Sequence, residues 1–94
     1  MMGKTVWAMS RQVEIVNELG LHARSAAGIA KLAEAAQKGV WIVRKEEIAD
    51  ARSILDILSL ACPKGARILI GIDDISDEEI LNRIVSLVES GFGE

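Results

Sequence analysis

The only histidine of the 94-residue sequence, His22, stands two positions before an arginine, Arg24. It follows the helix-breaking Gly20 and precedes an alanine-rich stretch whose apolar residues recur at helical spacing. The first backbone N–H groups of a helix have no partner within the helix and carry partial positive charge, so this end stabilises an anion. An arginine guanidinium can bind phosphate oxygens in bidentate fashion. Together these residues predict a cradle for a phosphate group.

The same helix end indicates what His22 can do. A positive environment disfavours the imidazolium form, so the ring is expected to be neutral, with a free lone pair on one nitrogen. That nitrogen is a nucleophile. Phosphoryl transfer mainly requires positioning and charge stabilisation, so one histidine and a helix end suffice without a metal ion. Taken from the residues alone, a histidine at this position is more often a capping or solvated residue, and Arg24 by itself a solvated charge.

The elements that must position these residues follow from the period of the apolar residues. Alternating or β-branched runs predict strands at 10–16, 40–43, 47–49 and 67–72. Helical spacing predicts helices over 23–37, from Ser53 as N-cap to a stop at Pro63, and from Ser76 to Gly91. Ser76 and Glu79 have the spacing of a capping box. The order of elements predicts a two-layer α/β sandwich with a mostly antiparallel sheet.

Composition narrows the class of protein. A chain with 50% hydrophobic and 27% charged residues is expected to fold as one domain over 1–94, with 1–9 as an N-terminal extension. A net charge of −3 gives no electrostatic reason to expect nucleic acid as a partner. The lone cysteine, Cys62, allows neither an internal disulfide nor a thiolate metal site, and no metal or cofactor is expected. Without a membrane-length apolar run or a signal peptide, no membrane insertion and a cytoplasmic location are expected.

Two motifs carry a resemblance to a known family. The string Gly20-Leu21-His22-Ala23-Arg24 resembles the signature of HPr, the histidine-containing phosphocarrier of the bacterial phosphotransferase system. Arg52-Ser53-Ile54 and Leu58-Ser59-Leu60 resemble that family's second, regulatory signature. The resemblance implies an open-faced β-sandwich, a four-stranded antiparallel sheet covered on one face by three helices in the order βαββαβα.

The resemblance also implies a function. His22 would be phosphorylated on a ring nitrogen by Enzyme I at the expense of phosphoenolpyruvate, with Arg24 as the partner of the phosphate. The phosphoryl group would pass to downstream phosphotransferase-system proteins, either sugar-specific IIA proteins or regulators. Ser53 matches the site that an ATP-dependent HPr kinase/phosphorylase modifies in some bacteria. A phosphate at an N-cap meets the positive helix end favourably, but Ser53 can also be a helix cap only.

Partner contacts are expected around the histidine. Leu55 and Leu58 match positions where the family exposes apolar side chains, and Leu21 and Ser25 flank His22 on the same surface. Such a patch would be small and suited to transient docking. Ile54 and Ile57, by contrast, are assigned to the core.

The sequence departs from the family at three places. Ser25 replaces the usual proline and can either cap the first turn of the helix or donate to the phosphate. Asp56 replaces the usual glycine and adds a negative charge where phosphorylated partners would dock. The turn at Lys45-Glu46 lacks the Asn-Gly pair common in such hairpins, which concerns local geometry only.

Two other functions remain open. A regulatory phosphorelay carrier without sugar transport would use the same chemistry on a different client. A regulatory domain could instead use His22 and Arg24 to bind an anion or a protein without covalent chemistry. An independent hydrolase is set aside because the sequence has no second histidine and no arrangement of nucleophile, base and orienting acid.

Overall fold

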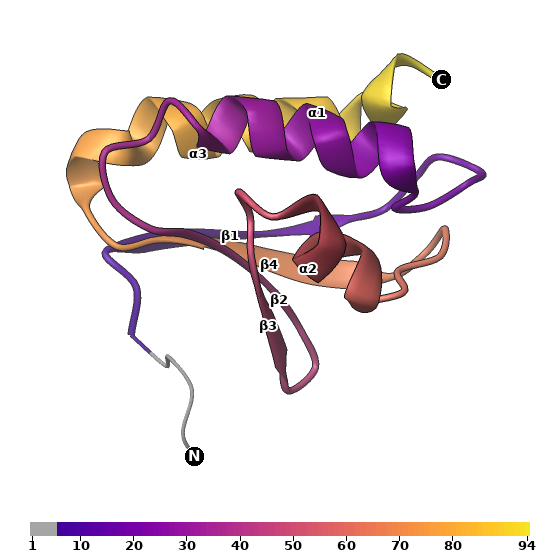
Figure 1. The fold of residues 1–94 in the computed structure, drawn as a ribbon, viewed down its shortest axis with the longest axis horizontal. Helices are drawn as coiled ribbons and strands as arrows, with labels where there is room; N and C mark the ends of the chain where they lie inside the picture. The colour runs from indigo at the N-terminus through magenta and orange to yellow at the C-terminus, as the bar shows by residue number, and fades with distance from the viewer. Residues whose placement is uncertain (1–5) are drawn as a thin grey trace.

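The computed structural model describes residues 6–94. Along the chain run β1 (Met9–Glu14), α1 (Ala23–Ala33), β2 (Val40–Arg44), β3 (Glu47–Asp50), α2 (Ile54–Ser59), β4 (Arg67–Ile72) and α3 (Glu78–Glu89), as Figure 1 shows. Short 3-10 turns at Ile75–Asp77 and Gly91–Gly93 flank the last helix. Most of the predicted N-terminal extension, residues 1–5, lies outside the described residues, and Met9 already belongs to β1.

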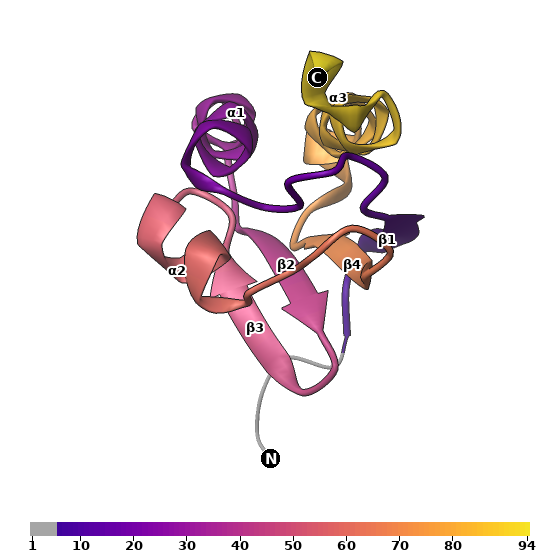
Figure 2. The same cartoon turned by 90° about the vertical axis from the view of Figure 1, so that its right-hand side faces the viewer.

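The strands form an antiparallel sheet in the order β1-β4-β2-β3. The central strand β4 pairs Val13 with Ile68 on one side and Ile42 with Ile70 on the other. Within residues 6–94, the three α-helices lie on one face of the sheet, with α1 and α3 side by side (Figure 2). The predicted four-stranded, open-faced sandwich is therefore confirmed.

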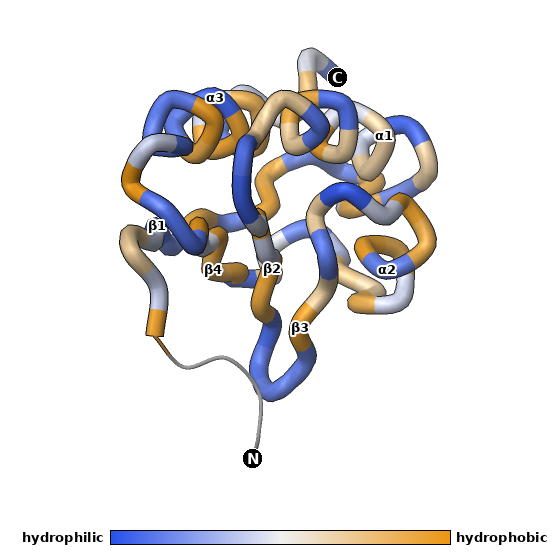
Figure 3. Tube along the Cα trace, turned by 60° about the vertical axis from the view of Figure 1, so that its left-hand side comes forward, coloured by the Kyte–Doolittle hydropathy of each residue, from blue (hydrophilic) through white to orange (hydrophobic). Residues whose placement is uncertain are grey.

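The core lies between the sheet and the helices. Alternate residues of β4, namely Ile68, Ile70 and Ile72, are buried and face the helices. Burying each of these side chains stabilises the fold by about 1.5–3 kcal/mol. Figure 3 shows apolar residues along β4 and hydrophilic ones in the turn between β2 and β3. The alternation of β4 explains why its bounds were predicted without error, at 67–72.

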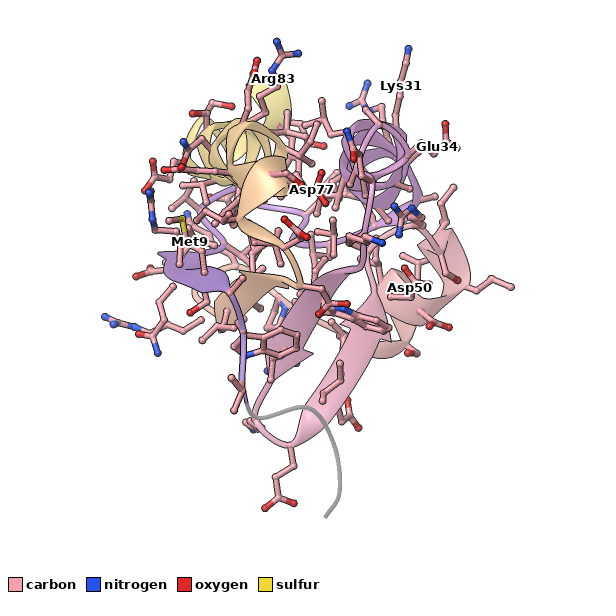
Figure 4. All side chains as sticks on the ribbon, turned by 90° about the vertical axis from the view of Figure 1, so that its left-hand side faces the viewer. Met9, Lys31, Glu34, Asp50, Asp77 and Arg83 are labelled. Atoms are coloured by element: carbon pink, nitrogen blue, oxygen red, sulfur yellow. The ribbon has the colours of Figure 1, made fainter. Side chains whose placement is uncertain are left out.

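Helix α1 ends at Ala33, earlier than the predicted Gln37. The carboxylate of Asp77 accepts the backbone N–H groups of Gln37 and Lys38, both at 2.9 Å, and lies between α3 and the end of α1 (Figure 4). The guanidinium of Arg52 donates to the carbonyls of Ala36 and Lys38 at 2.8 and 2.9 Å. Because these backbone groups bind distant side chains, the helix cannot continue through them.

Three further details of the prediction were wrong. Ser76 does not cap α3, because Asp74 caps a 3-10 turn over Ile75–Asp77 by accepting the N–H of Ser76 at 2.9 Å. Ile54, assigned to the core, is 39% exposed because it opens the short helix α2, whereas Ile57 is buried as predicted. The last helix ends at Glu89, and a 3-10 turn begins at Gly91.

Candidate functional site

The loop before α1 turns at Gly20, whose φ is +67°. A Cβ at this position would lie 2.3 Å from the carbonyl oxygen of Cys62, so only glycine fits. The next residue, Leu21, donates its backbone N–H to the same carbonyl at 2.9 Å. The segment after α2 therefore holds the loop that carries His22.

His22 is the N-cap residue of α1, with an extended backbone (φ −126°, ψ −175°). Its backbone N–H donates to Ser25 Oγ at 2.8 Å. Its side chain faces the backbone N–H of Ser25 in the arrangement of a capping box, without closing an N-cap hydrogen bond. The imidazole, 27% exposed, thus lies at the positive end of α1, where an anion is stabilised.

The side chain of Ser25 forms hydrogen bonds within the first turn of α1 and the loop before it. Its side chain is 1% exposed, and its hydroxyl lies 3.1 Å from the carbonyls of both Gly20 and His22, to one of which it donates. Of the two roles considered from the sequence, the geometry favours capping. Leu21 is also buried, at 7% exposure. The side chains of Leu21 and Ser25 therefore offer little surface to a partner and instead fix the backbone around His22.

A carboxylate from the far end of the chain completes the site. The turn Gly91–Gly93 brings Glu94 beside His22, at the end of the molecule where α1 begins (Figure 1). Glu94 Oε2 lies 2.6 Å from His22 Nε2, and Glu94 Oε1 accepts the side-chain N–H of Asn17 at 3.0 Å. Hydrogen bonds from Asn17 and His22 lower the pKa of Glu94, so this carboxylate is ionised at neutral pH.

Arg24 extends from the first turn of α1 into solvent, with 79% of its side chain exposed. Its guanidinium lies 3.7 Å from Glu94 Oε2, a loose ion pair that solvent screens. The guanidinium is therefore on the same side as the imidazole and is not immobilised by this contact. It is free to turn toward an anion that arrives at His22.

Helix α2 lies beside the start of α1 (Figure 2). Its N-cap, Ser53, accepts the backbone N–H of Asp56 at 3.1 Å, so the capping interpretation of Ser53 describes the structure. Leu55 is 78% exposed, as the resemblance implied. Leu58 is less exposed than the resemblance implied. It is half-buried, because part of its side chain packs against the core. Leu19, in the loop before His22, is a further exposed apolar side chain.

The described residues give no support for a metal site, a reactive thiol or a membrane-spanning helix. Among residues 6–94, no group of three histidine, cysteine, aspartate or glutamate side chains is placed to hold a metal ion. Burial raises the pKa of the Cys62 thiol, which makes it a poor nucleophile. Over the same residues, no helix has the length and apolar character needed to cross a bilayer.

Comparison with known proteins decides the family. A family model described as the phosphorylation site of the PTS HPr component matches residues 9–90, which include His22 and every element of the sheet. The chain belongs to the HPr family. The finding supports a phosphocarrier role and confirms the resemblance seen in the sequence.

The relatives that match this chain include proteins named NPr and proteins named HPr. The phosphocarrier protein NPr of Shewanella violacea is 40% identical over 87 residues, covering 92% of this chain and 94% of that protein. The phosphocarrier protein HPr of Neisseria meningitidis is 29% identical over 86 residues, covering 92% and 97%. The crystal structure of HPr from Thermoanaerobacter tengcongensis superposes with a TM-score of 0.86 at 32% identity, covering 92% of this chain and 97% of that one.

Sequence reasoning missed Asn17 and Glu94 as members of the site. Asn17 lies directly after the predicted strand 10–16 and belongs to no motif, and Glu94 gave no signal because 72 positions separate it from His22. Leu19 was also missed, because a loop this short has no apolar periodicity that would show which of its side chains are exposed.

Proposed function

We propose that the chain accepts a phosphoryl group on His22 from phosphorylated Enzyme I, ultimately from phosphoenolpyruvate, and passes it to a downstream phosphotransferase-system protein. The observation that supports this most is the position of the imidazole at the N-cap of α1, facing the backbone N–H of Ser25. A phosphoryl group bonded there would have its oxygens at the positive helix end. The family model, described as a phosphorylation site, matches residues 9–90, and this range includes His22.

The transfer is a simple exchange of bonds. The lone pair of an imidazole nitrogen attacks phosphorus, and the bond between phosphorus and the donor atom of Enzyme I breaks as the new P–N bond forms. In the second half of the cycle, a nucleophile of the acceptor protein takes the phosphoryl group and the imidazole leaves with its lone pair. The carrier supplies position and charge, and each partner supplies the rest of the site.

Arg24 is the proposed phosphate partner. Its guanidinium is exposed and loosely paired with Glu94, so reorienting it toward the phosphoryl oxygens breaks no strong contact. Charge-assisted, bidentate hydrogen bonds from a guanidinium stabilise a phosphoryl group as its charge shifts during transfer. Arg24 would thereby lower the barrier for both halves of the cycle.

Docking is proposed on the apolar side chains near His22. Leu55 and Leu19 are 78% and 66% exposed, and Ile54 adds a third partly exposed side chain. The loop of His22 is tied to the segment after α2 through the carbonyl of Cys62, which holds this loop close to the end of α2. A patch of this size fits transient contacts, as a carrier that must release each partner requires. Because the phosphoryl group would come from phosphoenolpyruvate, a metabolite of the cytoplasm, the proposed location of the protein is the cytoplasm.

Ser53 is proposed as a cap first and as a substrate for HPr kinase/phosphorylase second. A phosphate on Ser53 would be stabilised by the positive end of α2. It would also come close to the carboxylate of Asp56, three residues on. Because two like charges repel, Asp56 opposes the modification. With the host's kinase and ATP, phosphorylation of Ser53 should therefore be faster in Asp56→Asn than in wild type, and equal rates would remove Asp56 from this account.

A regulatory relay without sugar transport is the second candidate. It uses the same site, and the observation that favours it is the charge of Asp56 on the helix that partners would approach. Relatives named HPr and NPr both match, so membership of the family does not indicate which protein accepts the phosphoryl group.

The experiment is a complete relay. Wild-type protein, phosphoenolpyruvate and Enzyme I are mixed with one acceptor at a time, either a sugar-specific IIA protein or a regulatory one, and phosphate on the acceptor is measured. Transfer that depends on the carrier supports the proposal, and the acceptor that is labelled distinguishes the two clients. A carrier that becomes labelled but labels no acceptor would contradict the second half of the cycle.

A further inference from the structure

The outer side of the helical layer carries a groove between α1 and α3. Figures 1 and 2 show these two helices side by side over the sheet. Between them is a hollow of about 380 Å³ that is open to solvent. Five small or apolar residues and two cations line it. A hollow of this volume is within the range of sites that bind ligands in proteins.

Gly28 keeps the groove open on the side of α1. It lies inside the helix, where glycine is less favourable than alanine, and its helical backbone does not require glycine. A Cβ at this position would lie 3.3 Å from Leu87 Cδ2 on α3. Because Gly28 lines the hollow, a longer side chain there would fill it. The glycine therefore has a consequence for the surface of the protein.

The floor of the groove is apolar along both helices. On the side of α1, Gly28, Leu32 and Ala35 are spaced at i, i+4 and i+7. On α3, Ile80 and Leu87 are seven positions apart. Seven positions along a helix span about 10 Å, which is two turns. The groove therefore fits the side chains that another helix presents on one face over two turns.

Lys31 and Arg83 lie on opposite rims of the groove. Figure 4 shows both side chains pointing away from the sheet, whereas Glu34 points to the side. No carboxylate lines the hollow. Arg83 is paired with Glu79, but both side chains are exposed and such a pair is weak. Within residues 6–94, Lys31 has no ion pair. In a chain of net charge −3, this positive, apolar groove is complementary to an anionic partner.

We propose that the groove between α1 and α3 binds an amphipathic helix of a partner protein, with apolar side chains on the face that enters the groove and carboxylates along both flanks. The apolar side chains would pack on the floor of the groove, and the carboxylates would pair with Lys31 and Arg83. Lys31 is nine positions after His22, about 13 Å along the axis of α1. The inference does not depend on the phosphoryl transfer proposed for His22.

The contact is expected to be small and the complex weak, with charge selecting the partner more than it adds to affinity. The test uses the full-length, 15N-labelled protein and two synthetic helical peptides of about 14 residues, or four turns. Both peptides carry leucine at helical spacing, and one has glutamate and the other lysine on the flanks. We expect the glutamate peptide to shift the amide resonances of α1 and α3 around the groove and the lysine peptide to leave them unchanged.

Two exposed cations can be removed from either side of the molecule. Lys31→Gln combined with Arg83→Gln should raise the Kd for the glutamate peptide about tenfold, because two exposed ion pairs are lost. Arg11→Gln combined with Arg67→Gln is the matched control, since it changes the net charge equally by removing exposed arginines from β1 and β4. The control should bind the peptide as wild type does.

Gly28→Gln tests the groove itself, because it fills the hollow without removing a charge. Glutamine favours a helix more than glycine does, and the new Cβ approaches only the flexible end of Leu87, so the fold should persist by circular dichroism. We expect the Kd for the glutamate peptide to rise at least about tenfold, because the added side chain occupies the place of the apolar anchors.

Each contrary outcome has a definite meaning. Equal binding of the two peptides, amide shifts elsewhere on the protein, or full binding by Gly28→Gln would overturn the groove as a docking site for an acidic helix. The same amide shifts with laurate would indicate a site for a small anionic amphiphile instead. Self-association of the free protein through these residues would indicate a second copy of the chain as the occupant. Either of the last two results would also overturn the proposal.

Discussion

His22 and Glu94 lie 72 positions apart in the sequence, yet their side chains meet at 2.6 Å at the start of α1. The imidazole thus has a helix end on one side and an ionised carboxylate on the other. The first favours a lone pair and the second favours a proton, and one neutral tautomer satisfies both. Asn17 keeps the carboxylate in place.

The pH dependence of this contact follows from Glu94. Hydrogen bonds from Asn17 and His22 lower its pKa below the ordinary value of 4.5. The stability that the contact contributes is therefore fully present at neutral pH and is lost as the pH falls through the lowered pKa. NMR titration of the Glu94 side-chain carboxyl should give a midpoint below 4.5 in wild type and a higher one in His22→Ala. An equal midpoint in both proteins would show that the histidine does not stabilise the carboxylate.

Arg24→Ala should slow phosphoryl acceptance without abolishing it. Losing charge-assisted hydrogen bonds to a phosphoryl group costs about 1.5–3 kcal/mol, which is roughly 10- to 100-fold in rate. Arg83→Ala is the control, because it removes an exposed arginine that is paired with Glu79 on α3. Single-turnover transfer from phosphorylated Enzyme I measures both variants. Arg24→Ala with the rate of the control would mean that the guanidinium does not act on the phosphate.

Leu55→Ser should weaken docking and leave the fold intact, because the side chain of Leu55 is 78% exposed. We expect the KM for this protein as substrate of Enzyme I to rise about three- to tenfold, with the thermal midpoint unchanged. Ile75→Ser is the control, since Ile75 is also exposed, at 54%, but lies before α3. The assignment of Leu55 to the partner surface would be wrong if both variants raised the KM equally.

Gly20→Ala should destabilise the loop that carries His22. The new Cβ would meet the backbone of Cys62 at 2.3 Å and of Pro63 at 2.9 Å, in addition to the strain of a positive φ. We expect a loss of about 2–5 kcal/mol in the free energy of unfolding. Gly65→Ala has the strain alone, because nothing lies within 4 Å of its Cβ position, and should cost about 1–2 kcal/mol. Urea unfolding measures both, and equal losses would refute the close approach.

Sequence periodicity predicted most of the fold because the core is built from local patterns. Ile68, Ile70 and Ile72 alternate in β4, and this alternation predicted the strand and its buried face. The end of α1 was predicted wrongly because side chains from elsewhere decide it. Asp77 and Arg52 take the backbone groups that would have continued the helix, and no pattern near Ala33 indicates this.

The site, like the fold, has a part that the sequence predicted and a part that only the structure shows. His22, Arg24 and the helix end that holds them lie within a few positions of one another, so their spacing was informative. Asn17 and Glu94 became part of the site only when the turn after α3 folded back against the loop before α1. Contacts of that kind depend on the tertiary arrangement and leave no periodic trace in the sequence.

The most direct test of the central claim is the intact mass of the protein after incubation with phosphoenolpyruvate and the host's own Enzyme I. Wild type should gain one phosphate that is lost in acid, as expected for a phosphorylated histidine, and His22→Ala, folded by circular dichroism, should gain none. No gain by wild type, with an Enzyme I that is active on another carrier, would contradict the phosphoryl transfer proposed here, and a gain by His22→Ala would contradict the site.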